Sequence, residues 1–321
     1  MKATLYIFLF SAAFFITCKN ERPASVSTPS KNLENPSDHY DFGSKKVDAM
    51  DSLLQQYAVF SLASDLSSLT PNEQKMIPIL IEAAQMMDEL YWEQCYGNKK
   101  WIESLQGKER AFALVNYGPW DRLNNNEPIL TKDIKKSGAN FYPNDMTNEE
   151  FEAWQDSSKT SQYTMIRRDK SGKLMSVPYH VYFSKQLERV SYLLEQAASL
   201  ADDAGLRNYL HLRAKALISD DYQASDMAWL EMKSNKIDIV IGPIENYEDQ
   251  LFGYKTSYES FVLIKDMEWS RKLEKFNAFL PELQKGLPVK DVYKMEAPGS
   301  DTELNAYDVI LSRADCNAGS K

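Results

Sequence analysis

The stretch IDIVIGPIENYED, residues 237–249, decides how the chain is interpreted, because a buried strand and a polar loop meet within it. Residues 237–241 are dominated by isoleucine and valine, a composition typical of a buried strand, and the run stops at Gly242-Pro243. The residues that follow combine several carboxylates with a phenol. Loops held by rigid strands commonly carry function, so we expect the functional side chains here.

Two interpretations of this loop follow from its residues. If it is extended, alternation places Glu245, Tyr247 and Asp249 on one side. A carboxylate there can hold the terminal ammonium of a peptide, and a phenol can donate a hydrogen bond to a carbonyl oxygen. The simpler alternative is an acidic turn exposed to water. The residues by themselves leave both interpretations open.

Helical start and stop signals precede this stretch. Thr70 is a suitable cap, Pro71 suits the first helical position, and Glu73 lies three residues after the cap. We therefore expect a helix from here to Gly97, with its apolar face in the core. Thr147, followed by a glutamate three residues later, predicts a second capping box.

The remaining periodicity predicts further helices, a hairpin and two separate strands. The expected helices lie near residues 47–60, 182–200, 208–217 and 224–233; the hairpin pairs 163–168 with 174–178; the strands lie near 260–264 and 307–311. No internal repeat or regular alternation of strand and helix emerges. The predicted class is α+β, mainly helical with a small antiparallel β-sheet or barrel.

Composition limits the possible partners. The chain has 46 acidic and 37 basic residues and a formal net charge of −9. This is the wrong sign for a protein that neutralises nucleic-acid phosphates, so no nucleic-acid partner is expected. With 43% hydrophobic residues, the chain has enough apolar material for a folded core.

The first residues indicate export. Lys2 precedes the apolar run 5–16, which is too short for a permanent membrane span, and Cys18 follows at once. We predict a signal peptide over residues 1–17, a lipid on Cys18, and a flexible tether as far as residue 46. The protein would then be anchored to a membrane in the cell envelope, on the periplasmic or surface side. Ordinary secretion is the alternative.

Motifs of the common enzyme classes are missing. The histidines are His39, His180 and His211, and none is spaced from another as in His-Glu-x-x-His, so no metal ligands are assigned. Nucleophile elbows, phosphate loops and dinucleotide fingerprints are also missing from the sequence. Cys95 and Cys316 are too far apart in sequence to suggest a disulfide framework, and each is interpreted as a core thiol.

Four stretches of the chain resemble one family. Residues 242–249 are similar to the Gly-Phe-Ile-Glu-Ser/Thr-Tyr-Arg-Asp motif of dipeptidyl-peptidase III metallopeptidases. Residues 258–262, YESFV, resemble the family's Glu-Phe-Glu-Gly-Phe-Val segment. Residues 117–122 (YGPWDR) and 138–143 (GANFYP) resemble the divergent bacterial lipoprotein and plant branch. The likeness covers most of the chain after residue 47.

The resemblance implies particular roles in the loop. Glu245 matches the glutamate that anchors the amino terminus of the substrate, and Tyr247 matches the tyrosine that assists peptide-bond cleavage. Asn246 and Asp249 are assigned to substrate binding with Glu245. The chain departs from the motif at Glu248, where the family often has arginine, and at the proline before Ile244, where it often has phenylalanine. We expect its local charge and substrate preference to differ from those of the family.

The resemblance also implies two lobes: a lower lobe of helices around a small β-barrel, and an upper helical lobe that binds zinc. Residues 47–321 resemble the lower, substrate-binding lobe. We expect a truncated product of a zinc-dependent exopeptidase that cleaves short peptides, with zinc in the intact parent, none in this chain, and no activity by the chain alone. The alternative is a non-catalytic envelope lipoprotein that binds peptides or sugars through Trp120, Trp154, Trp229 and Trp269.

Overall fold

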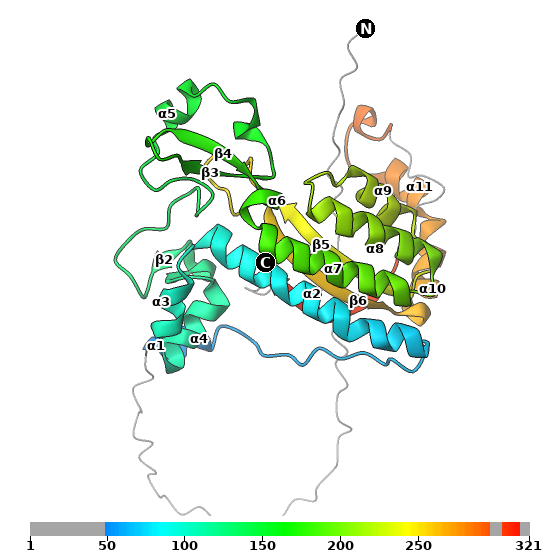
Figure 1. Cartoon of the computed structure of the whole chain (residues 1–321). Helices are drawn as coiled ribbons and strands as arrows, with labels where there is room; N and C mark the ends of the chain where they lie inside the picture. The colour runs from blue at the N-terminus through cyan, green and yellow to red at the C-terminus, as the bar shows by residue number, and fades with distance from the viewer. Residues whose placement is uncertain (1–48, 296–303, 315–321) are drawn as a thin grey trace, which may run out of the picture. The chain divides into compact units, whose positions relative to one another are not determined.

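The structure is a computed structural model that describes residues 49–295 and 304–314 (Figure 1). The predicted signal peptide and tether, residues 1–46 including Cys18, therefore lie outside the described residues. The described residues all belong to one compact unit.

The elements follow one another in an α+β order that agrees with the predicted class. The helices are α1 Ala49–Leu54, α2 Pro71–Cys95, α3 Lys99–Ser104, α4 Gly107–Asn116, α5 Asn148–Ala153, α6 Tyr179–Tyr182, α7 Ser184–Leu200, α8 Ala204–Leu217, α9 Gln223–Glu231, α10 Met267–Asn277 and α11 Leu280–Gly286. The strands are β1 Trp120–Asp121, β2 Glu127–Pro128, β3 Thr164–Arg168, β4 Leu174–Pro178, β5 Ile237–Glu245, β6 Ser257–Lys265 and β7 Tyr307–Ala314. Short 3-10 helices cover Arg122–Asn124, Ser157–Thr160 and Asp291–Tyr293.

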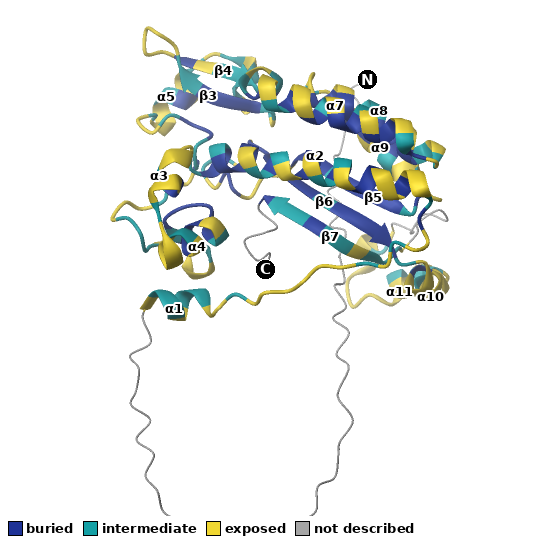
Figure 2. Ribbon diagram, turned by 60° about the horizontal axis from the view of Figure 1, so that its bottom comes forward, coloured by how far each residue is buried: buried dark blue, intermediate teal, exposed yellow. Residues whose placement is uncertain are grey.

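The largest sheet in the described part of the chain has the antiparallel order β5-β6-β7. Ile237, Ile239 and Ile241 alternate along β5 with exposed fractions of 0%, 0% and 1%, which places them on one covered face. Helix α2 lies along the sheet, with α7 packed on its other side (Figure 1), and Figure 2 shows β6 buried along most of its length. Ser260 of β6 donates to the carbonyl of Ala84 in α2 at 2.9 Å, which joins the two layers.

Helix α2 begins and ends where the sequence predicts. Thr70 accepts from the backbone N–H of Glu73, and the Glu73 carboxylate accepts from the Thr70 N–H at 2.8 Å, which completes the capping box. Pro78, the eighth residue of α2, is accommodated within the helix. The chain leaves the helix at Gly97, whose φ of +75° is in the left-handed region. The predicted apolar face is in the core, with Met87 fully buried.

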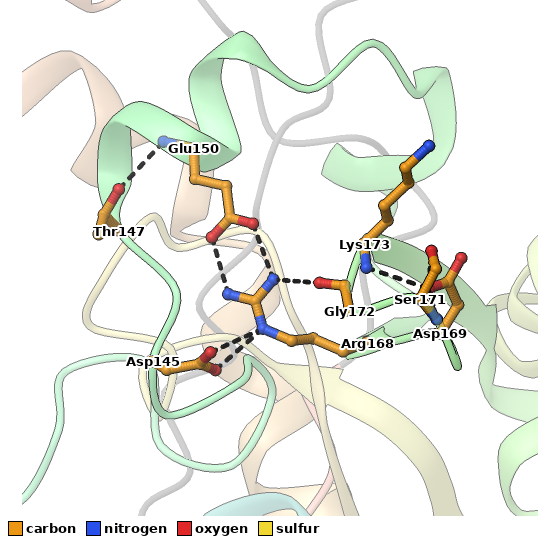
Figure 3. Close-up of polar contacts among 8 residues, drawn as sticks. All are labelled: Asp145, Thr147, Glu150, Arg168, Asp169, Ser171, Gly172 and Lys173. Carbon is orange, nitrogen blue, oxygen red and sulfur yellow. Dashed lines mark hydrogen bonds and ion pairs between the residues drawn. The ribbon is translucent and has the colours of Figure 1, made fainter.

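The predicted hairpin is confirmed as β3–β4, and a network around Arg168 holds it to α5 (Figure 3). The Arg168 guanidinium donates to both carboxylate oxygens of Glu150 at 2.7 and 2.8 Å, to Asp145 at 2.8 Å and to the Gly172 carbonyl at 2.7 Å. Thr147 caps α5 as predicted, by accepting from the backbone N–H of Glu150 at 3.1 Å. The Glu150 side chain binds Arg168, so the glutamate of the predicted capping box serves the hairpin.

Three expectations need correction. The helix expected over residues 47–60 ends at Leu54, and Phe60 beyond it is 71% exposed rather than packed in the core. Strand β5 continues through Gly242-Pro243, because β5 lies at the edge of the sheet, where a missing N–H can be tolerated. Among the described residues the sheet stays open, with β5 and β7 at its two ends, so the barrel alternative is wrong for this part of the chain.

Candidate functional site

The candidate loop leaves β5 through a β-bulge. Pro243 pairs with Tyr258 and Glu245 pairs with Ser257, so Ile244 is an extra residue on β5. A bulge bends its strand and changes the direction of the side chains that follow. Glu245 is exposed at the end of the strand.

A tight turn follows the bulge. The Asp249 N–H donates to the Asn246 carbonyl at 3.1 Å, which closes a turn with Tyr247 and Glu248 at its two central positions. Tyr247 is 49% exposed, while Glu248 and Asp249 are 4% and 2% exposed. The one-sided alternation of an extended loop, one of the two interpretations that the residues left open, is therefore not observed: Glu245 and Tyr247 are exposed, but Asp249 is buried.

Asp249 instead organises the inside of the loop. Its Oδ2 accepts from the backbone N–H groups of Tyr254 and Lys255 at 2.9 and 3.0 Å, and its Oδ1 accepts from the N–H of Leu251 at 3.2 Å. The Tyr142 hydroxyl donates to the same carboxylate at 2.7 Å. Burial, followed by the Asp249 charge, raises the pKa of Tyr142 well above its ordinary value, so this phenol stays a donor.

Asn246 is exposed, and its side chain also has a local partner. Its Nδ2 donates to the Gly253 carbonyl at 2.8 Å, across the neck of the loop. Gly253 has a φ of +69°, a conformation that glycine adopts without strain. The predicted substrate-binding roles of Asn246 and Asp249 stay predictions, but the structure places both side chains in contacts that hold the loop's shape.

Glu248 lies at the centre of a buried charge cluster. Its carboxylate accepts from Arg122 Nη1 at 2.9 Å, from Lys135 Nζ at 2.6 Å and from the Tyr91 hydroxyl at 3.1 Å. Burial by itself would raise the pKa of Glu248, but the charges of Arg122 and Lys135 outweigh burial and lower that pKa. Glu248 is therefore ionised at neutral pH and already neutralised by protein cations.

Lys255, at the end of the loop, bonds the segment before β3 and the first residue of β3. It is fully buried, and its ammonium donates to the carbonyls of Lys159 and Ser161 at 2.7 and 2.8 Å and to the Thr164 hydroxyl at 2.7 Å. Burial lowers the pKa of Lys255 to about 7, although the Asp249 carboxylate opposes the change. Neither Glu248, Asp249 nor Lys255 is presented to a ligand, which leaves Glu245 as the exposed carboxylate of residues 245–249.

The described histidines are engaged with single carboxylates. His180 Nδ1 lies 2.8 Å from Asp220, and His211 Nδ1 lies 2.5 Å from Glu195. Within the described ranges, no three His, Cys, Asp or Glu side chains come together as a metal site. His39 lies outside these ranges. The described donors therefore do not fit the zinc that the family resemblance implies.

The other predicted residues are spread over the fold. Trp154 and Trp229 pack against the main core, and Trp269 is 43% exposed on α10. Trp120 Nε1 donates to the carbonyl of Asp133 at 2.7 Å. Cys95 is a buried thiol, as expected, whereas Cys316 lies outside the described residues.

Sequence reasoning missed the partners of the loop. Residues 117–122 and 138–143 stand out in the sequence only as family-like stretches, yet they deliver Arg122 to Glu248 and Tyr142 to Asp249. No sequence pattern distinguishes Lys135. One signal was available in the sequence: Glu248 stands where the family motif often has arginine. A carboxylate that is buried at such a position requires a cation from another part of the chain.

The site is thus an exposed carboxylate and an exposed phenol on one loop of an α+β fold. Residues 127–300 match the model of peptidase family M49, which is more than half of the chain. The chain therefore belongs to peptidase family M49, and the resemblance to dipeptidyl-peptidase III is confirmed.

Two solved structures and one plant protein are similar to this chain. DPP III from Caldithrix abyssi is 37% identical, with a TM-score of 0.78 over 84% of this chain and 54% of that chain. Dipeptidyl-peptidase III from Corallococcus sp. strain EGB is 28% identical, with a TM-score of 0.75 over 85% of this chain and 53% of that chain. Nudix hydrolase 3 from Arabidopsis thaliana is 29% identical over 83% of this chain and 42% of its own length. The chain thus spans about half the length of the proteins that it matches.

Proposed function

We propose that this chain provides the substrate-binding part of a zinc-dependent exopeptidase that cleaves short peptides. Membership of a peptidase family supports the reaction class. The observation that carries the proposal is the difference in exposure among the side chains of the loop. Glu245 and Tyr247 are exposed, while Glu248 and Asp249 are buried and bonded within the protein. A single available carboxylate beside a phenol suits one terminal ammonium and one carbonyl oxygen.

In this proposal, the residues have separate tasks. The Glu245 carboxylate receives the amino terminus of the peptide through a charge-assisted hydrogen bond. The Tyr247 hydroxyl donates to the carbonyl oxygen of the scissile bond, where negative charge develops during attack. Zinc, when bound, would activate the attacking water. Because the described donors do not form its site, we propose that the chain alone binds peptides without hydrolysing them.

Peptide binding tests the proposal directly. We expect isothermal titration calorimetry to detect tetra-alanine with a free amino terminus and to detect little binding of its N-acetylated form. Glu245→Gln should weaken binding of the free peptide about tenfold or more, since a hydrogen bond to a charged group is lost. Glu188→Gln, an exposed glutamate on α7, is the control and should change nothing. Equal binding of free and acetylated peptide would contradict the role of Glu245.

The sugar-binding alternative receives less support from the fold. Rings that stack on sugars must be exposed, but Trp154 and Trp229 are partly buried against the main core, and only Trp269 of the four tryptophans is exposed. Trp229 Nε1 also donates to the carboxylate of Asp238 at 2.9 Å. A non-catalytic peptide-binding lipoprotein stays the second candidate, because peptide binding through Glu245 and Tyr247 would not require zinc.

We also propose that the protein is anchored through a lipid on Cys18 in the cell envelope, on the basis of the apolar run before that cysteine. No helix within residues 49–295 and 304–314 is long and apolar enough to cross a membrane. Metabolic labelling with a fatty-acid probe should mark the wild-type protein and leave Cys18→Ala unmarked. Equal labelling of the two proteins would contradict the anchor.

A further inference from the structure

Side chains from three segments meet beneath the candidate loop. We call them the platform: Tyr91 from α2, Arg122 and Lys135 from the segment after α4, and Tyr142 from the segment before α5. All four donate to the two carboxylates that follow Tyr247 in the sequence.

The contact at Glu248 is desolvated and directional. The Arg122 and Lys135 side chains are 13% and 9% exposed, and the Glu248 side chain is 3% exposed. Arg122 is held from behind, because its Nε donates to the Asn116 carbonyl at 2.7 Å and its guanidinium lies 5.6 Å from the centre of the Tyr91 ring. Water therefore screens this cluster little, and its geometry restrains the backbone at Glu248.

The contact at Asp249 is equally close. The Gln250 N–H donates to the Ser137 carbonyl at 2.8 Å, so a backbone hydrogen bond joins the loop to the stretch between Lys135 and Tyr142. A Cβ on Gly138 would lie 3.2 Å from Leu251 and 2.6 Å from Tyr142, so the loop rests directly on this glycine. The family-like stretch at residues 138–143 thus has a physical task in supporting the loop.

We propose that the platform is a positioning device, in which Arg122, Lys135 and Tyr142 fix Glu248 and Asp249 so that Glu245 and Tyr247 point toward the peptide. The expected effect on peptide binding rests on the proposed function, whereas the contacts between the platform and the loop do not depend on it. The bulge at Ile244 restrains one end of the loop, and the platform restrains the other. Glu248 pairs with cations that lie elsewhere in the chain.

Lys135 offers the sharpest variants. Lys135→Met removes one charge from the Glu248 cluster and keeps an unbranched apolar stem, whereas Lys135→Arg keeps the charge. Tyr142→Phe is a milder second variant, since Asp249 retains its backbone donors. Arg168→Met is the control, because it breaks a comparable network on the β3–β4 hairpin in which Arg168 bonds Asp145, Glu150 and Gly172 rather than Glu248 or Asp249 (Figure 3).

The first measurement is hydrogen exchange of the full chain without peptide. We expect Lys135→Met to speed exchange of amides at residues 246–255 about tenfold or more, through easier local opening, and to leave residues 164–178 unchanged. Lys135→Arg should restore slow exchange, and Tyr142→Phe should show a smaller rise. Arg168→Met should speed exchange in the hairpin and leave residues 246–251 unchanged. Unchanged exchange at residues 246–255 in Lys135→Met would overturn the proposal.

The second measurement is the ratio of affinities for free and N-acetylated tetra-alanine. A positioning role predicts that Lys135→Met lowers this ratio about tenfold while its melting transition stays cooperative, and that Lys135→Arg restores it. If Lys135→Met exchanged faster in the loop but kept the same affinity ratio, the platform would stabilise the loop without positioning Glu245 and Tyr247. That outcome would overturn the positioning role. If the wild-type protein bound neither peptide, the proposed function would fail, and the exchange data would still decide whether the platform holds the loop.

Discussion

At the residue scale, neighbouring acidic residues in this protein have opposite surroundings. Glu245 is exposed, whereas Glu248 is buried with two cations and Asp249 is buried with backbone donors. An unpaired carboxylate would be costly at either buried position, so the partners are a requirement of burial. Composition alone would count these residues as one acidic cluster, although only Glu245 remains available to a ligand.

The buried Lys255 gives a pH-dependent prediction. Its pKa is lowered to about 7 in the folded protein, while the unfolded chain keeps the ordinary higher value. Below about pH 7 both states bind the proton. Between that pH and the unfolded value, only the unfolded chain binds it, so raising the pH stabilises the folded state.

We therefore expect the unfolding free energy of the wild-type protein, relative to Lys255→Met, to rise by up to about 2 kcal/mol between pH 7 and 9. Urea titrations of both proteins at pH 6, 7.5 and 9 measure this difference, and the comparison cancels the other titrating groups. Lys255→Met should be less stable throughout, because the Lys159 and Ser161 carbonyls lose their donor. A difference that stays constant with pH would show that Lys255 does not titrate in this range.

At the element scale, Gly97 at the end of α2 has two roles: it ends the helix, and its lack of a side chain leaves room for the segment that contains Asn140. Gly97 adopts its left-handed conformation at the helix end, as the sequence predicts. A Cβ there would lie 2.3 Å from Asn140 Nδ2, which donates to the Glu93 carbonyl at 2.7 Å. The glycine thus ends the helix and also admits the segment that carries Tyr142 to the loop.

Gly97→Ala should reduce the unfolding free energy by about 2 kcal/mol, from backbone strain together with displacement of Asn140. Gly107→Ala is the matched control, because Gly107 has a φ of +54° but a Cβ added to it would meet no atom within 4 Å. It should lose only about 1 kcal/mol, from strain. Urea unfolding of the two variants measures the difference, and equal losses would mean that the approach of Asn140 is unimportant.

At the scale of the whole molecule, apolar surface is concentrated in residues 267–295. Phe276, Phe279 and Leu283 are 58%, 54% and 59% exposed in α10, α11 and the link between them. Figure 2 shows these helices largely exposed, in contrast to the buried strands β5 and β6. Single exposed apolar side chains are ordinary, but several of them within one short segment favour association.

We expect the purified chain to self-associate in a concentration-dependent manner, and Phe276→Glu with Leu283→Glu to shift it toward monomer. Multi-angle light scattering over a dilution series measures the mass. Met175→Glu, which changes an isolated side chain 40% exposed on β4, should leave the association unchanged. A wild-type protein that is monomeric at every concentration would show that this surface does not mediate association.

The sequence by itself determined the local elements and the family. The capping box at Thr70, the stop at Gly97, the hairpin at residues 163–178 and the core of β5 follow from short-range rules, since each depends on residues a few positions apart. The substrate-binding role of Glu245 stays a prediction, for a residue that is exposed in the fold.

Only the tertiary structure decided which acidic residues face the solvent and which support the loop. The bulge at Ile244 and the turn after it break the alternation that an extended loop would have. Glu248 meets Arg122 across 126 positions of the chain and Lys135 across 113, and no local periodicity encodes such a meeting. Long-range packing selects these partners, because burying each charge requires an opposite charge that the fold brings from another segment.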